Sequence, residues 1–253
     1  MFPIGDQAHT RGGIPIVNLA IIAANLAVFF MLQIPSDAFT YGYSAVPYEI
    51  TRGEDLVGLT PIPGTAEAVP HAAGPQPIWL TLFSSMFMHG GFDHIFGNML
   101  FLFIFGDNVE LALGGIRYLA LYLVCGIVAT FAHIAFGPDS IIPSLGASGA
   151  ISGVLATYLV FFPSNKVRVL VGWYYVAQVP AVFMIGLWAL FQFVNGFASI
   201  AVSAQTSGVA YMAHVGGFVA GVLLALLLRP FAHRGEVQAA AEHARPILRR
   251  GRW

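Results

Sequence analysis

The stretch Ile14–Ile34 reads IPIVNLAIIAANLAVFFMLQI and contains no charged residue. An α-helix of this length, about 21 residues, crosses the roughly 30 Å hydrocarbon core of a bilayer. Five further apolar runs follow, although two of them are short or interrupted by polar side chains. The pattern predicts six membrane-spanning helices at Ile14–Ile34, Gly91–Asn108, Ile116–Phe136, Ser148–Phe162, Ala177–Ser203 and Gly208–Leu228.

The composition supports an all-α polytopic membrane protein. Of 253 residues, 57% are hydrophobic and only 9% are charged, whereas soluble domains carry roughly 25% charged residues. Helices are expected because an open sheet leaves backbone groups unsatisfied in lipid, and the sequence lacks the alternation of barrel strands. The single cysteine, Cys125, excludes an internal disulfide framework and a metal site built from several cysteines.

The basic residues predict the orientation of the helices. Of the eleven Lys and Arg residues, only Arg52 falls on one side of the six spans, so the other side is expected to be cytoplasmic. The expected organisation is a short cytoplasmic N-terminus (1–13), a six-helix core (14–228) with a long outer loop (35–78), and a basic cytoplasmic tail (229–253). Short termini favour a bacterial inner membrane, with both termini in the cytoplasm.

Two short segments carry a serine and a histidine in apolar surroundings. Gly146-Ala147-Ser148-Gly149 opens the fourth predicted span, and Ala213-His214-Val215-Gly216-Gly217 lies in the sixth. A serine and a histidine form the smallest pair for nucleophilic hydrolysis, and ionisable groups within membranes usually mark functional sites. Helix rise places Ser148 roughly 8 Å and His214 roughly 9 Å below the outer face.

The second predicted span contributes two polar residues near that depth. His94 and Asn98 are one turn apart on one helix face, at about 5 and 11 Å from the outer end of the span. Polar side chains from three helices are therefore expected to meet near the outer face of the membrane.

Glycines predict close packing of the fourth and sixth spans. Gly149 and Gly153 are four residues apart on one, as are Gly217 and Gly221 on the other. Small residues at this spacing let helix backbones approach closely. A general base has to lie within about 3 Å of its nucleophile, so the glycines suit a site that is shared by the two helices.

Together these motifs resemble the rhomboid family of intramembrane serine proteases over roughly residues 14–228. The resemblance rests on Gly146-Ala147-Ser148-Gly149, on His214 followed by Gly216, Gly217 and Gly221, and on His94-Ile95-Phe96-Gly97-Asn98. It implies a six-helix bundle with Ser148 as nucleophile and His214 as general base. It also implies an oxyanion hole formed by the side chains of His94 and Asn98 and the backbone N–H of Ser148.

The sequence departs from the family pattern at two positions. Trp79 is followed by Leu80 where the family often has an arginine, and Ser152 replaces a tyrosine that stacks on the histidine in some members. We expect Ser152 to bond back to its own helix and His214 to be held by other contacts. Gln192 and Asn195 in the fifth span fit cavity lining and plain packing equally well.

The function expected from the resemblance is endoproteolysis of transmembrane segments. The expected partners are membrane protein substrates and the bilayer, with no metal, cofactor or nucleic acid. Alternatives are an inactive relative that binds membrane clients and a proton-coupled transporter that uses His94 and His214. A metalloprotease is disfavoured because no His-Glu-x-x-His motif occurs. Outside the candidate site, we expect Glu110 and Arg117 to form a cytoplasmic loop pair and His89 to be interfacial or catalytic.

Overall fold

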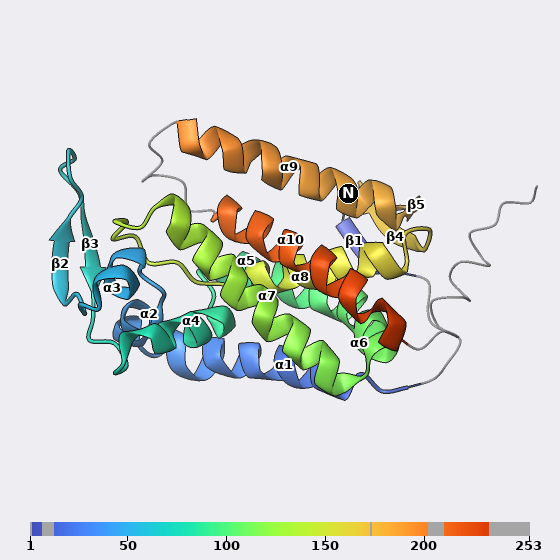
Figure 1. Ribbon diagram of the computed structural model, residues 1–253, viewed down its shortest axis with the longest axis horizontal. Coiled ribbons are helices and arrows are strands. Elements are labelled where there is room, and N and C mark those ends of the chain that lie inside the picture. The colour runs from blue at the N-terminus through green and yellow to red at the C-terminus, as the bar shows by residue number, and fades with distance from the viewer. Residues whose placement is uncertain (1, 7–12, 173, 202–209, 233–253) are drawn as a thin grey trace, which may run out of the picture.

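The computed structural model describes residues 2–6, 13–172, 174–201 and 210–232. Every predicted apolar segment contains a helix (Figure 1). α1 runs on into the π-helical η1, and α5, η4 and α6 follow one another without a break. The bounds are α1 Ile16–Val28, η1 Phe29–Gln33, α5 Phe92–Phe101, η4 Leu102–Gly106, α6 Asp107–Leu113, α7 Gly115–Phe136, α8 Ser148–Phe161, α9 Ala181–Ala201 and α10 Tyr211–Leu228.

These helices have the length and composition of membrane spans. Four in the described part of the chain are long and apolar enough to cross a bilayer: Ile16–Gln33, Phe92–Leu113, Gly115–Phe136 and Tyr211–Phe231. α8 and the part of α9 whose side chains are described, Ala181–Gly196, are shorter. The protein is therefore a mostly helical membrane protein, and the count of six spans stays a prediction.

α8 lies at the centre of the bundle and is buried along nearly its whole length. It packs mainly against α10 and α7. A Cβ atom on Gly217 would collide with the backbone of Gly149, and one on Gly221 would collide with the backbone of Gly153. The two pairs of glycines therefore let α8 and α10 touch backbone to backbone, as their spacing predicted.

Glu110 holds the beginning of α1. Its carboxylate accepts hydrogen bonds from the backbone N–H groups of Val17 (3.0 Å) and Asn18 (2.6 Å). The predicted loop pair of Glu110 with Arg117 is therefore wrong: Glu110 is buried, and Arg117 donates to the carbonyl of Leu113. The free N–H groups of a helix start attract a carboxylate that the surrounding chain brings near.

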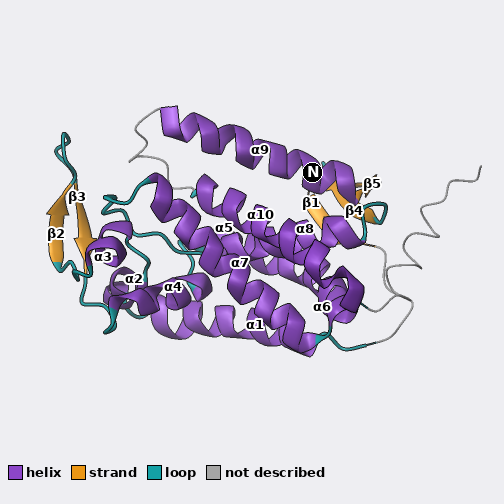
Figure 2. Ribbon diagram, in the orientation of Figure 1, coloured by secondary structure: helices purple, strands orange, loops and turns teal. Residues whose placement is uncertain are grey.

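A small sheet, not predicted from the sequence, closes one end of the bundle (Figure 2). Its antiparallel strands are β1 (Phe2–Asp6), β4 (Lys166–Val171) and β5 (Tyr175–Pro180), in the order β1-β4-β5. Residues 177–180, expected to begin the fifth span, thus belong to β5, and α9 begins only after Pro180. The valine-rich β4 pairs along its full length with the whole of β5, and Pro180 suits the start of a helix because it has no N–H to donate.

The segment 35–78 is folded at the opposite end of the bundle (Figure 1). It was expected only to be a long loop. The structure gives it short helices and a two-stranded hairpin: α2 (Asp37–Tyr43), α3 (Pro47–Arg52), β2 (Gly58–Pro61) and β3 (Ala68–His71). The 3₁₀-helix η2 (Ile78–Leu80), α4 (Thr81–Ser84) and the 3₁₀-helix η3 (Ser85–Phe87) then lead towards α5, and the 3₁₀-helix η5 (Arg229–Phe231) follows α10. The rest of the predicted basic tail, residues 233–253, lies outside the described residues.

Candidate active site

Ser148 is the first residue of α8. Gly146, two residues earlier, has φ +141°, and a Cβ atom there would lie 2.9 Å from Cε1 of the His94 ring. Only glycine fits both the backbone angle and this close approach. The first backbone N–H groups of a helix have no partner within the helix, so the backbone N–H of Ser148 has no acceptor within α8.

His214 lies in the first turn of α10 and reaches Ser148. Its Nε2 is 2.8 Å from Oγ of Ser148, which is hydrogen-bonding distance. The two residues are brought together by the contact between α8 and α10, in which Gly149 lies against Gly217. In this geometry Ser148 donates its hydroxyl proton when Nε2 is unprotonated.

The other side of His214 contacts α9. Nδ1 of His214 lies 2.8 Å from Oε1 of Gln192, and the ring centroid of Trp188 lies 6.0 Å from that of His214, at 39° between the planes. Ser152 makes no such contact, because its hydroxyl donates to the carbonyl of Ser148 (2.7 Å). The expectations that Ser152 bonds within its helix and that other contacts hold His214 are both met.

His94 and Asn98 face the same space from α5. The backbone N–H of Gly90 donates to Nδ1 of His94 (3.2 Å), so a neutral His94 carries its proton on Nε2, on the side of the ring towards Gly146. Asn98 is buried, and its Nδ2 has no hydrogen-bond partner within the described part of the chain. Both side chains therefore have a free donor.

A cavity of about 690 Å³ connects these groups. His94, Asn98, Ser148 and His214 all line it, together with Trp188. The four polar residues that the sequence placed at one depth thus share one cavity. Two of them offer donors, and the other two form the hydrogen-bonded serine and histidine.

The comparison with known protein families matches residues 76–231 to the model of the rhomboid domain. This match covers more than half of the chain and every residue of the candidate site. The chain belongs to the rhomboid family.

Individual rhomboid proteins are similar over various parts of the chain. The Rhomboid protease GluP of Bacillus subtilis is 29% identical over 225 residues, which cover 88% of this chain and 37% of that protein. Rhomboid protein 1, mitochondrial, of Saccharomyces cerevisiae is 30% identical over 57% of this chain and 40% of its own length. RHOMBOID-like protein 4 of Arabidopsis thaliana is 29% identical over 87% of this chain and 55% of its own length. The aligned regions thus span about a third to a half of these relatives.

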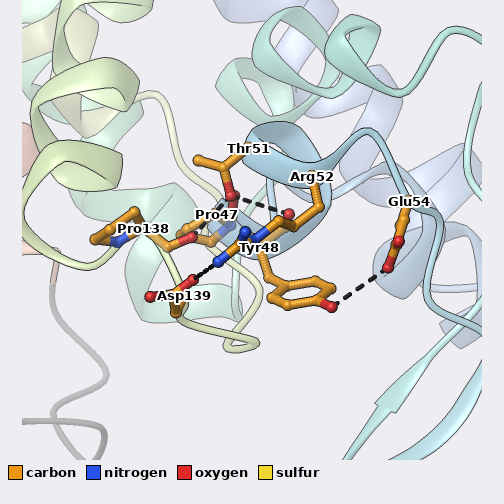
Figure 3. Close-up of polar contacts among 7 residues, drawn as sticks. All are labelled: Pro47, Tyr48, Thr51, Arg52, Glu54, Pro138 and Asp139. Carbon is orange, nitrogen blue, oxygen red and sulfur yellow. Dashed lines mark hydrogen bonds and ion pairs between the residues drawn. The ribbon is translucent and has the colours of Figure 1, made fainter.

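The chain just before Ser140, a residue of the cavity lining, is fastened to α3 (Figure 3). Arg52 forms an ion pair with Asp139 (2.7 Å), and the hydroxyl of Thr51 donates to the carbonyl of Pro138 (2.9 Å). The backbone N–H of Tyr48 donates to the carbonyl of Ser140, and Ser140 lines the cavity. The folded segment 35–78 therefore supports the chain that leads into Ser148.

His89 lies behind the site rather than in it. It is 2% exposed, is absent from the cavity lining, and packs edge-on against the ring of His94 (5.1 Å between centroids). Burial lowers the pKa of His89 to about 3, so the ring is neutral and adds no charge next to His94. Of the two roles expected for His89, a catalytic one does not fit, because the side chain is buried and does not line the cavity; the interfacial one stays a prediction.

Ser148, His214, His94 and Asn98 could be named from the sequence, but the contacts of His214 with α9 could not. Trp188 and Gln192 are one helical turn apart, a spacing that puts them on the same face of α9. A polar residue one turn from a tryptophan in an apolar helix was the available signal. The sequence does not show how α9 is rotated about its axis, so that signal could not distinguish a contact with His214 from ordinary packing.

Proposed function

We propose that this protein is an intramembrane serine endopeptidase that cleaves peptide bonds within or next to transmembrane segments of other proteins. The observation that carries the proposal is the 2.8 Å distance between Nε2 of His214 and Oγ of Ser148. Membership of the rhomboid family and the protease names of relatives such as GluP support it.

In the proposed reaction, Oγ of Ser148 attacks the carbonyl carbon of the scissile bond while His214 takes the hydroxyl proton. The carbonyl oxygen becomes an oxyanion. When the C–N bond breaks, the protonated His214 gives its proton to the leaving amine, and an ester on Ser148 remains. Water then hydrolyses this ester, with His214 again acting as the base.

The oxyanion requires donors that are already in place. We assign this role to Nδ2 of Asn98, Nε2–H of His94 and the backbone N–H of Ser148. The buried amide of Asn98, for which no hydrogen-bond partner is described, supports this assignment. An unpaired buried donor lowers the free energy of unfolding, and a donor kept ready for an oxyanion gives a reason for that cost.

The proposed substrates are membrane proteins whose helices unwind readily. A helix hides its carbonyl groups in hydrogen bonds, so small residues at the cut and a nearby Gly or Pro would ease access to Ser148. The proposed setting is the bacterial inner membrane, with both termini in the cytoplasm and the cavity open to the outer side.

The test is covalent labelling with a fluorophosphonate probe, which needs no knowledge of the substrate. The full chain in mild detergent is compared with Ser148→Ala and His214→Ala. Labelling of the wild type alone is expected, because the probe reacts with an activated serine. No labelling of folded wild type, or equal labelling of Ser148→Ala, would overturn the proposal; the first result would favour a client-binding protein without activity.

A further inference from the structure

Two side chains of α9, one turn apart, hold the imidazole of His214. Oε1 of Gln192 lies 2.8 Å from Nδ1, and Trp188 lies beside the ring. Gln192 is 7% exposed, so water does not compete freely for this contact. α9 carries neither the serine nor the histidine, yet it supplies both of these contacts.

We propose that Gln192 is a positioning residue that fixes the tautomer of His214, an inference that rests on the proposed function. A neutral imidazole carries one proton, on either Nδ1 or Nε2. The amide oxygen of Gln192 accepts a hydrogen bond only from Nδ1–H. With the proton on Nδ1, Nε2 has a free lone pair, and it is Nε2 that faces the hydroxyl of Ser148.

Asn195, the second amide side chain compared on α9, shows that a polar residue of this helix does not have to contact α10. Asn195 donates Nδ2–H to the carbonyl of Phe191 in its own helix (2.7 Å), which is how polar side chains in apolar helices are commonly satisfied. Gln192 instead reaches across to α10. The two amides, three positions apart, provide a matched pair for experiment.

Gln192 takes the place that an aspartate occupies in a serine–histidine–aspartate triad, but it has no charge. It can therefore orient His214 without forming an ion pair with the imidazolium. The geometry also makes the base depend on α9: if α9 moved away from α10, His214 would lose its acceptor and its aromatic neighbour together.

The first experiment measures the rate of fluorophosphonate labelling of the full chain in detergent. Gln192→Met keeps the size of the side chain and removes the acceptor, and Gln192→Ala serves if that variant does not fold. Both should label about 10- to 100-fold more slowly, as expected for loss of an outer contact that orients a functional histidine. Gln192→Glu, which retains an acceptor, should restore most of the rate. Asn195→Leu, the control on the same helix, should label at the wild-type rate.

The second experiment observes the tautomer directly and does not depend on activity. The ¹⁵N NMR shifts of histidine-labelled protein distinguish Nδ1–H from Nε2–H, and the signals of His214 are identified by their loss in His214→Gln. The wild type should show Nδ1–H, and Gln192→Met should show a mixture of the two tautomers.

The outcomes separate the two proposals. If the wild type labels in a Ser148- and His214-dependent way but Gln192→Met labels equally fast, the positioning role is wrong and the protease proposal stands. If the wild type does not label, the protease proposal fails and NMR alone decides the role of Gln192. An unchanged tautomer in Gln192→Met would overturn that role in either case.

Discussion

The carboxylate of Glu110 accepts a hydrogen bond from the backbone N–H of Asn18, across 92 positions of sequence. The preceding residue of α1, Val17, donates to the same carboxylate, and Asn18 itself bonds the carbonyl of Leu102 and the hydroxyl of Tyr118. One end of α1 is thereby fixed to α6, η4 and α7. Pro15, which precedes α1, makes no side-chain capping hydrogen bond at this end.

Replacing Glu110 with alanine should destabilise the bundle. Two backbone donors would lose their acceptor, and a buried unsatisfied donor costs about 1–3 kcal/mol. The thermal unfolding midpoint in detergent is expected to fall for Glu110→Ala. The exposed Glu67 provides the control, and equal midpoints for Glu110→Ala and Glu67→Ala would contradict the capping role.

A side chain at Gly217 should separate α8 from α10. A Cβ atom on Gly217 would collide with the carbonyl oxygen of Gly149, and overpacking of this kind costs about 1–3 kcal/mol or more. Gly217→Ala should lower the unfolding midpoint and abolish fluorophosphonate labelling, because Ser148 and His214 would move apart. Gly186→Ala is the matched helical control, since a Cβ there meets nothing within 4 Å. Wild-type labelling by Gly217→Ala would refute the need for backbone contact.

Loss of the amide of Asn98 should slow the reaction of Ser148 without unfolding the protein. One oxyanion donor contributes about 10²- to 10³-fold in rate. Asn98→Ala is therefore expected to label roughly that much more slowly, at a similar unfolding midpoint. Asn195→Ala removes an amide that only bonds its own helix and should leave the rate unchanged. If Asn98→Ala kept the wild-type rate, Asn98 would not be an oxyanion donor.

The attachment of β1 should weaken as the pH rises towards neutrality. Burial raises the pKa of Asp6 from 3.8 to about 7, despite hydrogen bonds from Tyr158 and Asn108. Between about pH 4 and 7 the folded state thus keeps a proton that the unfolded chain has lost. The contribution of Asp6 to the free energy of unfolding is therefore largest below about pH 4 and declines as the pH rises to about 7. Asp6→Asn cannot titrate. The unfolding midpoint of the wild type minus that of Asp6→Asn should fall between pH 4 and 7, and a flat difference would show that Asp6 does not titrate in this way.

The apolar runs predicted the helices well because lipid leaves the backbone few alternatives. The start of α9 was misplaced because Tyr175–Pro180 is apolar enough to read as helix, and only pairing with β4 makes it a strand. The partner of Glu110 was misjudged for a related reason: nothing near Glu110 in sequence shows that it meets Asn18.

The site residues could be named from sequence because glycines with regular spacing bracket Ser148 and His214. The contact of Gln192 with His214 could not be named in the same way. It depends on how α9 is rotated against α10, which the packing of many apolar side chains decides.

The sheet at one end of the bundle has a consequence for biosynthesis. Phe2 pairs opposite Leu170, so β1 leaves the ribosome long before its partner strand exists. It has no partner strand while the helices from α1 to α8 are made. Pairing of β1 with β4 is then a late event of assembly, possible only once these helices have been made.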